Sequence, residues 1–293
     1  MNIIGIILGL FSALSEASLN TVVNKYKASY SPVLMGFAQL LFLLPVTLVM
    51  ALMIPWPEFS WQLVIFLGIF AILNVIGRIL YIKAIHLSGL SKTVPFLSFT
   101  PVFLILSGFI ILGEVPNLFG LIGLVLIVCG SYVLTCNKFG ESIFTSLKNI
   151  KNERGVLLAI ATAFVWSLTS SFGKKAVMLS SPIFFFVMAI NLQFILFLFI
   201  NMKVTGVRKT INLFRNDIKF FLLASLFLGL MEFSISTAYS LTKIVYAISM
   251  KRMAIFFSVL FGYLFFKETG FKKNIIAAII MVAGVIIITI LGK

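Results

Sequence analysis

GIILGLFSALSEASLNTVVNKYKASYSP, residues 5 to 32, aligns without a gap on GVLLAIATAFVWSLTSSFGKKAVMLSSP, residues 155 to 182. A second pair of stretches repeats at a similar offset. LILSGFIILGEVPNLFGLIGLVLIVCG, residues 104 to 130, aligns on SVLFGYLFFKETGFKKNIIAAIIMVAG, residues 258 to 284. The matched positions include Glu114 with Glu268 and Gly130 with Gly284. Together, the two alignments indicate a chain built from two copies of one unit.

The composition places both copies in a membrane. Of the 293 residues, 61% are hydrophobic and 11% are charged, and the mean hydropathy is +1.17. Apolar runs about as long as a bilayer is thick recur along the chain. We therefore predict an all-α integral membrane protein with about ten transmembrane helices. The expected spans are 3–23, 33–54, 61–82, 93–112, 117–136, 155–173, 182–202, 220–240, 244–266 and 274–292.

The longest polar segment divides the expected spans equally. We predict a first five-helix repeat over residues 1–136, a basic linker over 137–154 and a second five-helix repeat over 155–293. Because each unit has an odd number of spans, the second copy must enter the bilayer from the opposite side. Such inverted repeats around a central cavity build many secondary transporters.

Each half ends in the same order of features. An apolar or aromatic helix leads to Gly113-Glu114 in the first half and to Lys267-Glu268 in the second, and a glycine-containing last helix follows. This duplicated order resembles the drug/metabolite transporter superfamily, EamA type, over essentially the whole chain. The resemblance implies a basket of helices around a central substrate cavity, with the last helix of each half outside it.

Polar residues at helical spacing mark the walls of the expected cavity, because ionisable side chains in a bilayer are expected to face protein or water. Glu16 and Asn20 share one face of the first span, and their repeat mates are Trp166 and Ser170. The expected substrate-binding residues are Lys251, Arg252, Arg78, Asn20, Tyr81, Ser98, Trp166, Ser170 and Tyr239, and the expected coupling groups are Glu16 and Glu232.

The adjacent cations Lys251 and Arg252 lie in the middle of an apolar run, residues 244–266. Each costs roughly 2.5 to 3.5 kcal/mol at the centre of a membrane helix. The twelve Ile, Leu, Val and Phe residues of this run offset about that much, at roughly 0.3 to 0.6 kcal/mol each. Cations that are this costly in a membrane helix are typical of a functional site or of a self-neutralising ion network. Three bases and two acids among the intramembrane residues leave one positive charge over if all are ionised.

The pair also resembles the Lys-Arg pair on the ninth helix of plastid triose-phosphate translocators, a branch of the same superfamily in which the two cations hold a phosphate. The resemblance is incomplete, because the repeat equivalents of Lys251 and Arg252 are Leu97 and Ser98. It implies only that an anionic group, carboxylate or phosphate, meets the two cations.

These features favour a secondary transporter, an exporter or exchanger of a small polar, anionic or zwitterionic metabolite. An ATP-driven pump is disfavoured, because the chain has no GxxxxGK[ST] motif. A channel or scaffold remains the alternative. A membrane enzyme is disfavoured, because His86, Cys129, Cys136 and Asp217 form no nucleophile, acid–base pair or metal cluster.

We expect a monomer or homodimer without cofactors, with a small-molecule substrate and the lipid bilayer as partners. Coupling to protons and exchange without protons are both compatible with the sequence. Nucleic acid is not expected despite the net charge of +15, because most Lys and Arg residues fall in short connections between spans. Sixteen of them lie in connections on one side and four on the other. The positive-inside rule then predicts a multi-pass protein of the cell membrane with both termini outside the cytoplasm.

Overall fold

The computed structural model describes residues 3–26, 30–88, 93, 96–135, 153–206, 217–266 and 271–291. Regular structure in these ranges is helical, which confirms the all-α class. The first repeat contains α1 (Ile3–Tyr26), α2 (Pro32–Leu41), α3 (Leu43–Met53), α4 (Trp61–Ser88), α6 (Thr100–Leu112) and α7 (Leu118–Thr135). The second contains α9 (Arg154–Met178), α10 (Pro182–Val204), α12 (Ile218–Leu241), α13 (Ile244–Lys251), α14 (Ala254–Phe266) and α15 (Phe271–Leu291).

The second span of each repeat begins with the same local structure. Ser31 caps α2 by accepting a hydrogen bond from the Leu34 amide at 3.3 Å, and Ser181 caps α10 by accepting from the Phe184 amide at 3.1 Å. In both helices proline follows the cap, where its missing N–H costs nothing. The Ser-Pro pairs of the sequence alignment are therefore equivalent helix starts.

The fourth span of each repeat is interrupted near its middle. Turns at Ser98–Phe99, before α6, and at Arg252–Met253, between α13 and α14, occupy equivalent positions in the two repeats. Pro101 accounts for the first interruption, because it supplies no N–H to the turn before it. The second has no proline. There the Arg252 amide is shared between the carbonyls of Ile248 and Ser249, at 3.0 and 3.1 Å, which tightens the last turn of α13.

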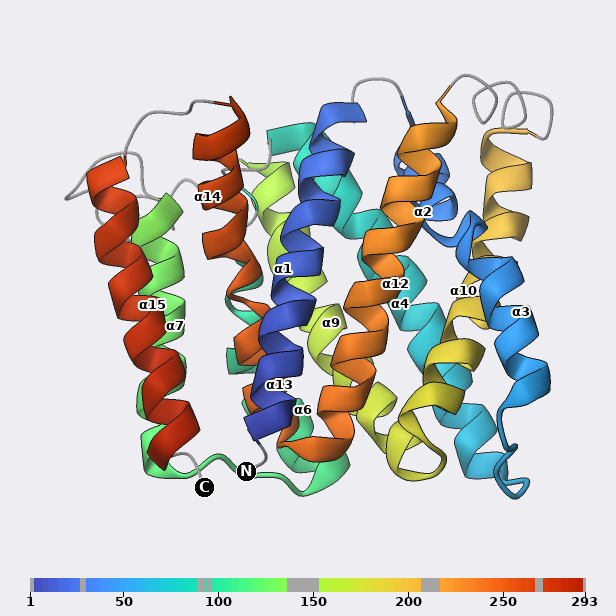
Figure 1. Cartoon of the computed structure of the whole chain (residues 1–293), viewed down its shortest axis with the longest axis horizontal. Coiled ribbons are helices and arrows are strands. Elements are labelled where there is room, and N and C mark those ends of the chain that lie inside the picture. The colour runs from blue at the N-terminus through green and yellow to red at the C-terminus, as the bar shows by residue number, and fades with distance from the viewer. Residues whose placement is uncertain are drawn as a thin grey trace.

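The two repeats run through the molecule in opposite directions. Figure 1 shows that α1 starts at the edge that holds both chain ends, whereas α9 starts at the opposite edge. We call these the terminus edge and the opposite edge. The antiparallel course of α1 and α9 agrees with the inverted repeat predicted from the sequence.

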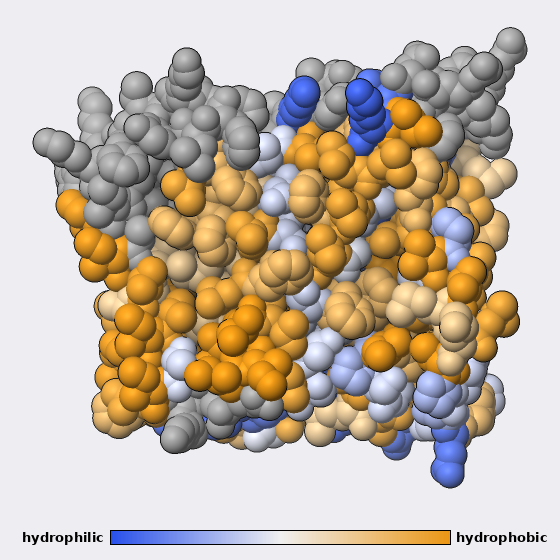
Figure 2. Space-filling view, viewed as in Figure 1, coloured by the Kyte–Doolittle hydropathy of each residue, from blue (hydrophilic) through white to orange (hydrophobic). Residues whose placement is uncertain are grey.

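Five helices are long and apolar enough to cross a membrane, by length and composition: the described part of α1, α4, α9, α10 and α12. A sixth candidate is the pair α2 and α3, which is bent by 44° at Phe42. Figure 2 shows a largely apolar face with hydrophilic residues gathered near its two edges. The multi-pass membrane class is thus supported, while the count of ten spans stays a prediction.

The last helix of each repeat stands apart from the centre, as the family resemblance implies. α7 and α15 lie side by side at one end of the molecule (Figure 1). A Cβ at Gly123 would come within 2.7 Å of the Gly284 carbonyl oxygen, and one at Gly284 within 2.6 Å of the Gly123 carbonyl oxygen. The two backbones therefore touch at these glycines, a close approach typical of membrane helix pairs.

The central helices pack as two pairs, α4 with α9 and α1 with α12. Each pair combines one helix from each repeat. The Ser12 hydroxyl donates to the Met231 carbonyl at 3.0 Å and so ties α1 to α12. The polar stripes of these four helices meet between the pairs, where the cavity described below lies.

Candidate functional site

A cavity of about 70 Å³ lies among the central helices. It is bordered by residues of α1, α2, α4, α9, α12 and α13 and by Arg252 at the interruption of the fourth span. The lining contains charged, amide, hydroxyl and aromatic side chains of both repeats, a composition suited to a polar ligand. The lining residues are Glu16, Leu19, Asn20, Val23, Gln39, Phe70, Asn74, Arg78, Tyr81, Ile82, Trp166, Thr169, Ser170, Met231, Glu232, Tyr239, Ile248, Lys251 and Arg252.

One charged group in this cavity is centred on Arg78. Its Nη1 donates to Gln39 Oε1 at 2.6 Å, and its Nη2 lies 3.3 Å from Asn74 Oδ1 and 3.4 Å from Glu232 Oε1. Asn74 is one helical turn before Arg78 on α4, so α4 itself supplies one of the partners. We call these four residues the Arg78 group. Both terminal nitrogens of the guanidinium have partners in it, whereas its Nε is buried without a hydrogen-bond partner among the described residues.

A second charged group joins Glu16 to the two cations of the interrupted span. Lys251 Nζ lies 3.8 Å from Glu16 Oε2, and Arg252 Nη1 lies 3.8 Å from Glu16 Oε1. These separations are ion pairs but too long for hydrogen bonds. Glu16 Oε2 and Arg252 Nε are buried and have no hydrogen-bond partner among the described residues. We call these three residues the Glu16 group.

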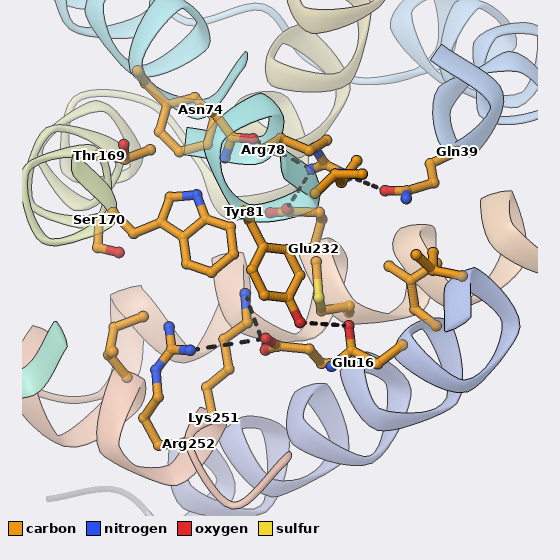
Figure 3. A pocket seen from close by; sticks show the side chains of 18 of the residues that line it. Glu16, Gln39, Asn74, Arg78, Tyr81, Thr169, Ser170, Glu232, Lys251 and Arg252 are labelled. Atoms are coloured by element: carbon orange, nitrogen blue, oxygen red, sulfur yellow. Dashed lines mark hydrogen bonds and ion pairs between the residues drawn. The ribbon is translucent and has the colours of Figure 1, made fainter. Parts of the chain in front are cut away.

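Tyr81 separates the two groups. Figure 3 shows the Arg78 group on one side of its ring and the Glu16 group on the other. The Tyr81 hydroxyl donates to Asn20 Oδ1 at 3.1 Å, which fixes the ring between α4 and α1. Its neighbour Trp166 has its ring centroid 5.2 Å from that of Tyr81, and the Arg252 guanidinium carbon lies 5.7 Å from the Trp166 ring. The indole thus gives Arg252 a cation–π contact in place of a hydrogen bond.

Gly77 explains where the indole lies. A Cβ at this position would come within 2.5 Å of Trp166 Nε1 and 2.6 Å of Trp166 Cδ1. A side chain at Gly77 is therefore incompatible with the present place of the indole. The sequence alone did not single out this glycine.

The interruption of the fourth span gives Lys251 and Arg252 their positions. Lys251 is the last residue of α13 and Arg252 follows it, where the partial negative charge at a helix C-terminus favours cations. Interrupted helices that place residues at mid-membrane are common at transporter substrate sites. The two adjacent cations of the sequence thus occupy a break rather than the middle of a regular helix.

The cavity brings together all but one of the residues that the sequence predicted for substrate binding or coupling. Ser98 is the exception. It is buried, receives a hydrogen bond from Ser131 and is not part of the cavity lining. It is the repeat mate of Arg252, so equivalent positions in the two repeats have different surroundings.

Three polar cavity residues, Gln39, Asn74 and Thr169, lie outside the set of site residues predicted from the sequence. Gln39 on α2 accepts from Arg78, and Thr169 lines the cavity from α9. Gln39 is a polar residue within the apolar stretch MGFAQLL, which is the signal that would have found it. Thr169 gives no comparable signal, because its hydroxyl bonds to the Val165 carbonyl at 2.8 Å, as a threonine inside any helix does.

The fold and the cavity define a multi-pass membrane protein of two repeats with a polar site between them. The sequence matches the EamA-like transporter family over residues 3–136 and 153–290, and the chain belongs to this family. Each of the two matches covers one repeat. The family is part of the drug/metabolite transporter superfamily, as the sequence resemblance implied, while membership of the triose-phosphate translocator branch stays unconfirmed.

No curated protein matches the chain. Among solved structures, one titled "Crystal structure of protein" is similar over 100% of this chain and 98% of its own, with a TM-score of 0.73 and 14% sequence identity. At this identity the similarity shows a shared fold and carries no information about the substrate.

Proposed function

We propose that this protein is a secondary transporter, an exporter or exchanger, that moves a small anionic or zwitterionic metabolite by alternating access. Membership of the EamA-like family supports a transporter rather than an enzyme. The anionic character of the substrate is our own inference from the cavity.

The Glu16 group is the observation that carries this proposal. Lys251 and Arg252 face the cavity, and the acid between them lies at 3.8 Å from each without a hydrogen bond. Buried cations are stabilised by close, hydrogen-bonded anions, and here that requirement is met only in part. A carboxylate or phosphate group of a substrate would supply the missing hydrogen bonds. The planar guanidinium suits such oxyanions because it donates two parallel bonds.

Alternating access is supported by the architecture. The inverted repeats surround the cavity, and the substrate-facing cations lie at an interrupted helix, two features of transporters that expose a central site to each side in turn. The cavity of about 70 Å³ is smaller than most ligand sites. Binding would therefore require side chains of the lining to move.

Proton coupling is proposed through the two cavity acids. Glu16 and Glu232 are both buried, and each pairs with a cation that also faces the cavity. Protonation of Glu16 would release Lys251 and Arg252 for a substrate anion. Exchange of one metabolite for another without protons is the alternative.

Counterflow in proteoliposomes tests the function. The purified protein is reconstituted into liposomes that are preloaded with one candidate metabolite, and uptake of the radiolabelled compound is followed across amino acids, carboxylates, sugar phosphates and neutral sugars. We expect saturable counterflow for a compound with an anionic group. An ohmic current without counterflow would indicate a channel, and release of a chemically altered compound would indicate an enzyme.

From the charges of the connections, we propose that the terminus edge faces the outside of the cell. Lys219 is exposed and lies at the start of α12, near the opposite edge, whereas the exposed Glu58 follows α3 on the terminus side. In a variant with Cys129 and Cys136 replaced by alanine, a membrane-impermeant maleimide added to intact cells should label Glu58→Cys and spare Lys219→Cys. The reverse pattern would place both termini in the cytoplasm.

A further inference from the structure

A cluster of polar groups outside the cavity joins three segments of the chain near the terminus edge. Lys174 Nζ forms an ion pair with Glu114 Oε1 at 2.5 Å and donates to the Thr242 carbonyl oxygen at 2.6 Å. Lys174 belongs to α9, Glu114 to the connection between α6 and α7, and Thr242 to the end of α12. We call these three residues the clasp. None of them lines the cavity.

Lys174 contributes a cation that is 6% exposed. A buried ammonium at a membrane helix end is costly unless its donors are occupied, and here a carboxylate and a backbone carbonyl occupy two of them. Both bonds are short for their type, which is typical of charge-assisted hydrogen bonds. This side chain therefore links α9 directly to the end of α12.

Glu114 is held in place by its own backbone and by α13. Gly113 ends α6 in the left-handed region, at φ +68°, and the Glu114 amide closes the turn on the Gly108 carbonyl at 3.2 Å. The second carboxylate oxygen accepts from the amide of Ile244 at 2.7 Å, at the first turn of α13. A carboxylate at a helix N-terminus satisfies an amide that has no partner within the helix. The Gly-Glu pair thus aims one acid of the first repeat at a helix of the second.

The clasp lies just beyond the cavity. Lys174 is four residues after Ser170, Thr242 is three after Tyr239 and Ile244 is four before Ile248, and those three residues line the cavity. About one helical turn, 5.4 Å, thus separates the lining from Lys174 on α9, from Thr242 at the end of α12 and from Ile244, the residue whose amide Glu114 accepts from, on α13. All three segments reach the terminus edge there (Figure 1). The clasp therefore lies between the cavity lining and the terminus edge.

We propose that the clasp is the gate of the transporter at the terminus edge. Parting α9 from the end of α12 and from Glu114 breaks both bonds of Lys174, whereas the cap of Glu114 on α13 remains. Opening this gate exposes the cavity to the terminus edge, and forming it again closes that route. This inference rests on the alternating access proposed above.

The repeat alignment adds a difference between the two edges. The repeat mates of Lys174, Glu114 and Thr242 are Asn24, Glu268 and Ser88. Asparagine has no charge, so the acid at position 268 has no cation at the position equivalent to Lys174. The gate at the terminus edge therefore has an ion pair whose equivalent the second set of repeat positions cannot form, because one of the two residues there is an uncharged asparagine. The clasp favours the conformation that is closed toward the terminus edge.

Accessibility of a cysteine in the cavity tests the gate without knowledge of the substrate. Ser170→Cys serves as the reporter in a variant with Cys129 and Cys136 replaced by alanine. A membrane-impermeant maleimide is applied to intact cells and to inverted membrane vesicles, so that the labelling rate is measured from each side of the membrane. With Lys174→Gln or Glu114→Gln added, the rate from the terminus edge should rise about tenfold or more, because a charge-assisted hydrogen bond is lost. The rate from the opposite edge should fall.

Lys175→Gln is the matched control, because it removes the same charge at the next residue, which is only half-buried. It should leave both labelling rates unchanged. Unchanged rates in a folded Lys174→Gln variant, or an equal rise in Lys175→Gln, would overturn the proposal. Gel filtration in detergent establishes that the variants are folded.

Glu114→Gln covers the case in which Lys174→Gln fails to fold, because it removes the other charge of the same ion pair. A folded Glu114→Gln variant with unchanged labelling rates would equally contradict the gate. The labelling experiment uses no substrate, so it can succeed when the counterflow screen fails. If labelling changes as expected but no anion shows counterflow, the proposed substrate class is rejected and the proposal of a gate stands.

Discussion

The two charged groups of the cavity differ in how well their partners satisfy them. In the Arg78 group both terminal guanidinium nitrogens have oxygen partners within 3.4 Å, whereas in the Glu16 group the nearest charged atoms are 3.8 Å apart. All four residues of the Arg78 group and two of the Glu16 group, Glu16 and Arg252, are buried, while Lys251 is half-buried. Arg78 Nε and Arg252 Nε both lack a hydrogen-bond partner among the described residues, so the difference lies in the other atoms. The better-satisfied group gains less from a further anion, while the under-satisfied one gains hydrogen bonds. We therefore propose a supporting function for Arg78 and a ligand-binding function for Lys251 and Arg252.

Removal of Arg78 should have the largest effect, and it should be an effect on folding. Arg78→Gln leaves the buried carboxylate of Glu232 without its cation, and breaking a buried pair in this way costs about 3 to 5 kcal/mol. We expect a much lower yield of folded protein and a lower melting temperature in detergent. A tryptophan-fluorescence melt of the purified variant measures this.

The double variant Arg78→Gln with Glu232→Gln is its control. It removes both charges, so most of the lost stability should return. If the single variant folds normally but no longer transports, Arg78 binds substrate instead and the contrast between the two groups fails.

Substitution in the Glu16 group should affect transport and spare the fold. Arg252→Lys keeps the positive charge beside Glu16 but removes the planar pair of donors, so the protein should insert and melt as before. Loss of two charge-assisted hydrogen bonds to a substrate anion should lower the counterflow rate about 100-fold. The rate is measured with whichever anion the proteoliposome screen identifies.

Replacement of both Lys251 and Arg252 by glutamine is the complementary test, because it removes both positive charges. This variant leaves Glu16 buried without a cation and should fold less well. Near-normal counterflow by Arg252→Lys, together with misfolding of the double variant, would make the Glu16 group a structural ion network.

Substitution of either acid should have a smaller effect, confined to the coupling of transport to protons. If protons are coupled through Glu232, Glu232→Gln should abolish uphill transport driven by a pH gradient. The fraction of this variant that folds, in which Gln39 and Asn74 still accept from Arg78, should retain part of the exchange. Glu16→Gln makes the same test beside the cations that we assign to the substrate. Uptake is measured with and without an imposed pH gradient in each variant. Unchanged proton dependence in both would remove these acids from coupling.

Sequence reasoning reached the class, the repeats and most of the cavity because membrane physics exposes them. Charged residues such as Glu16 and Glu232 are so costly in hydrocarbon that their presence in apolar runs already marks an interior surface. The gap-free alignment of the two halves likewise follows from the sequence alone. The family match over both repeats confirms this part.

The features that the sequence did not reveal depend on distances between helices. Arg78 and Lys251 look alike as cations in apolar runs, and only the contacts distinguish the satisfied one from the loosely held one. The position of Ser98 outside the cavity has the same origin, because repeat equivalence does not fix the surroundings of a side chain. Trp166 was singled out as a polar-stripe residue, but its support by Gly77 needs the packing of α4 on α9.

The smallest expected effect concerns that support. Gly77→Ala places a methyl group within 2.5 Å of Trp166 Nε1, so the indole must move and its contact with the Arg252 guanidinium weakens. Cation–π contacts of this kind contribute about 0.5 to 2 kcal/mol. The half-saturating concentration of the transported anion should therefore rise about threefold to tenfold, with little change in the maximal rate. Gly68→Ala on the same helix is the control, because a Cβ there meets nothing within 4 Å. An equal rise in both variants would mean that the effect comes from α4 as a whole, and no rise in either would mean that Trp166 does not position Arg252 for the anion.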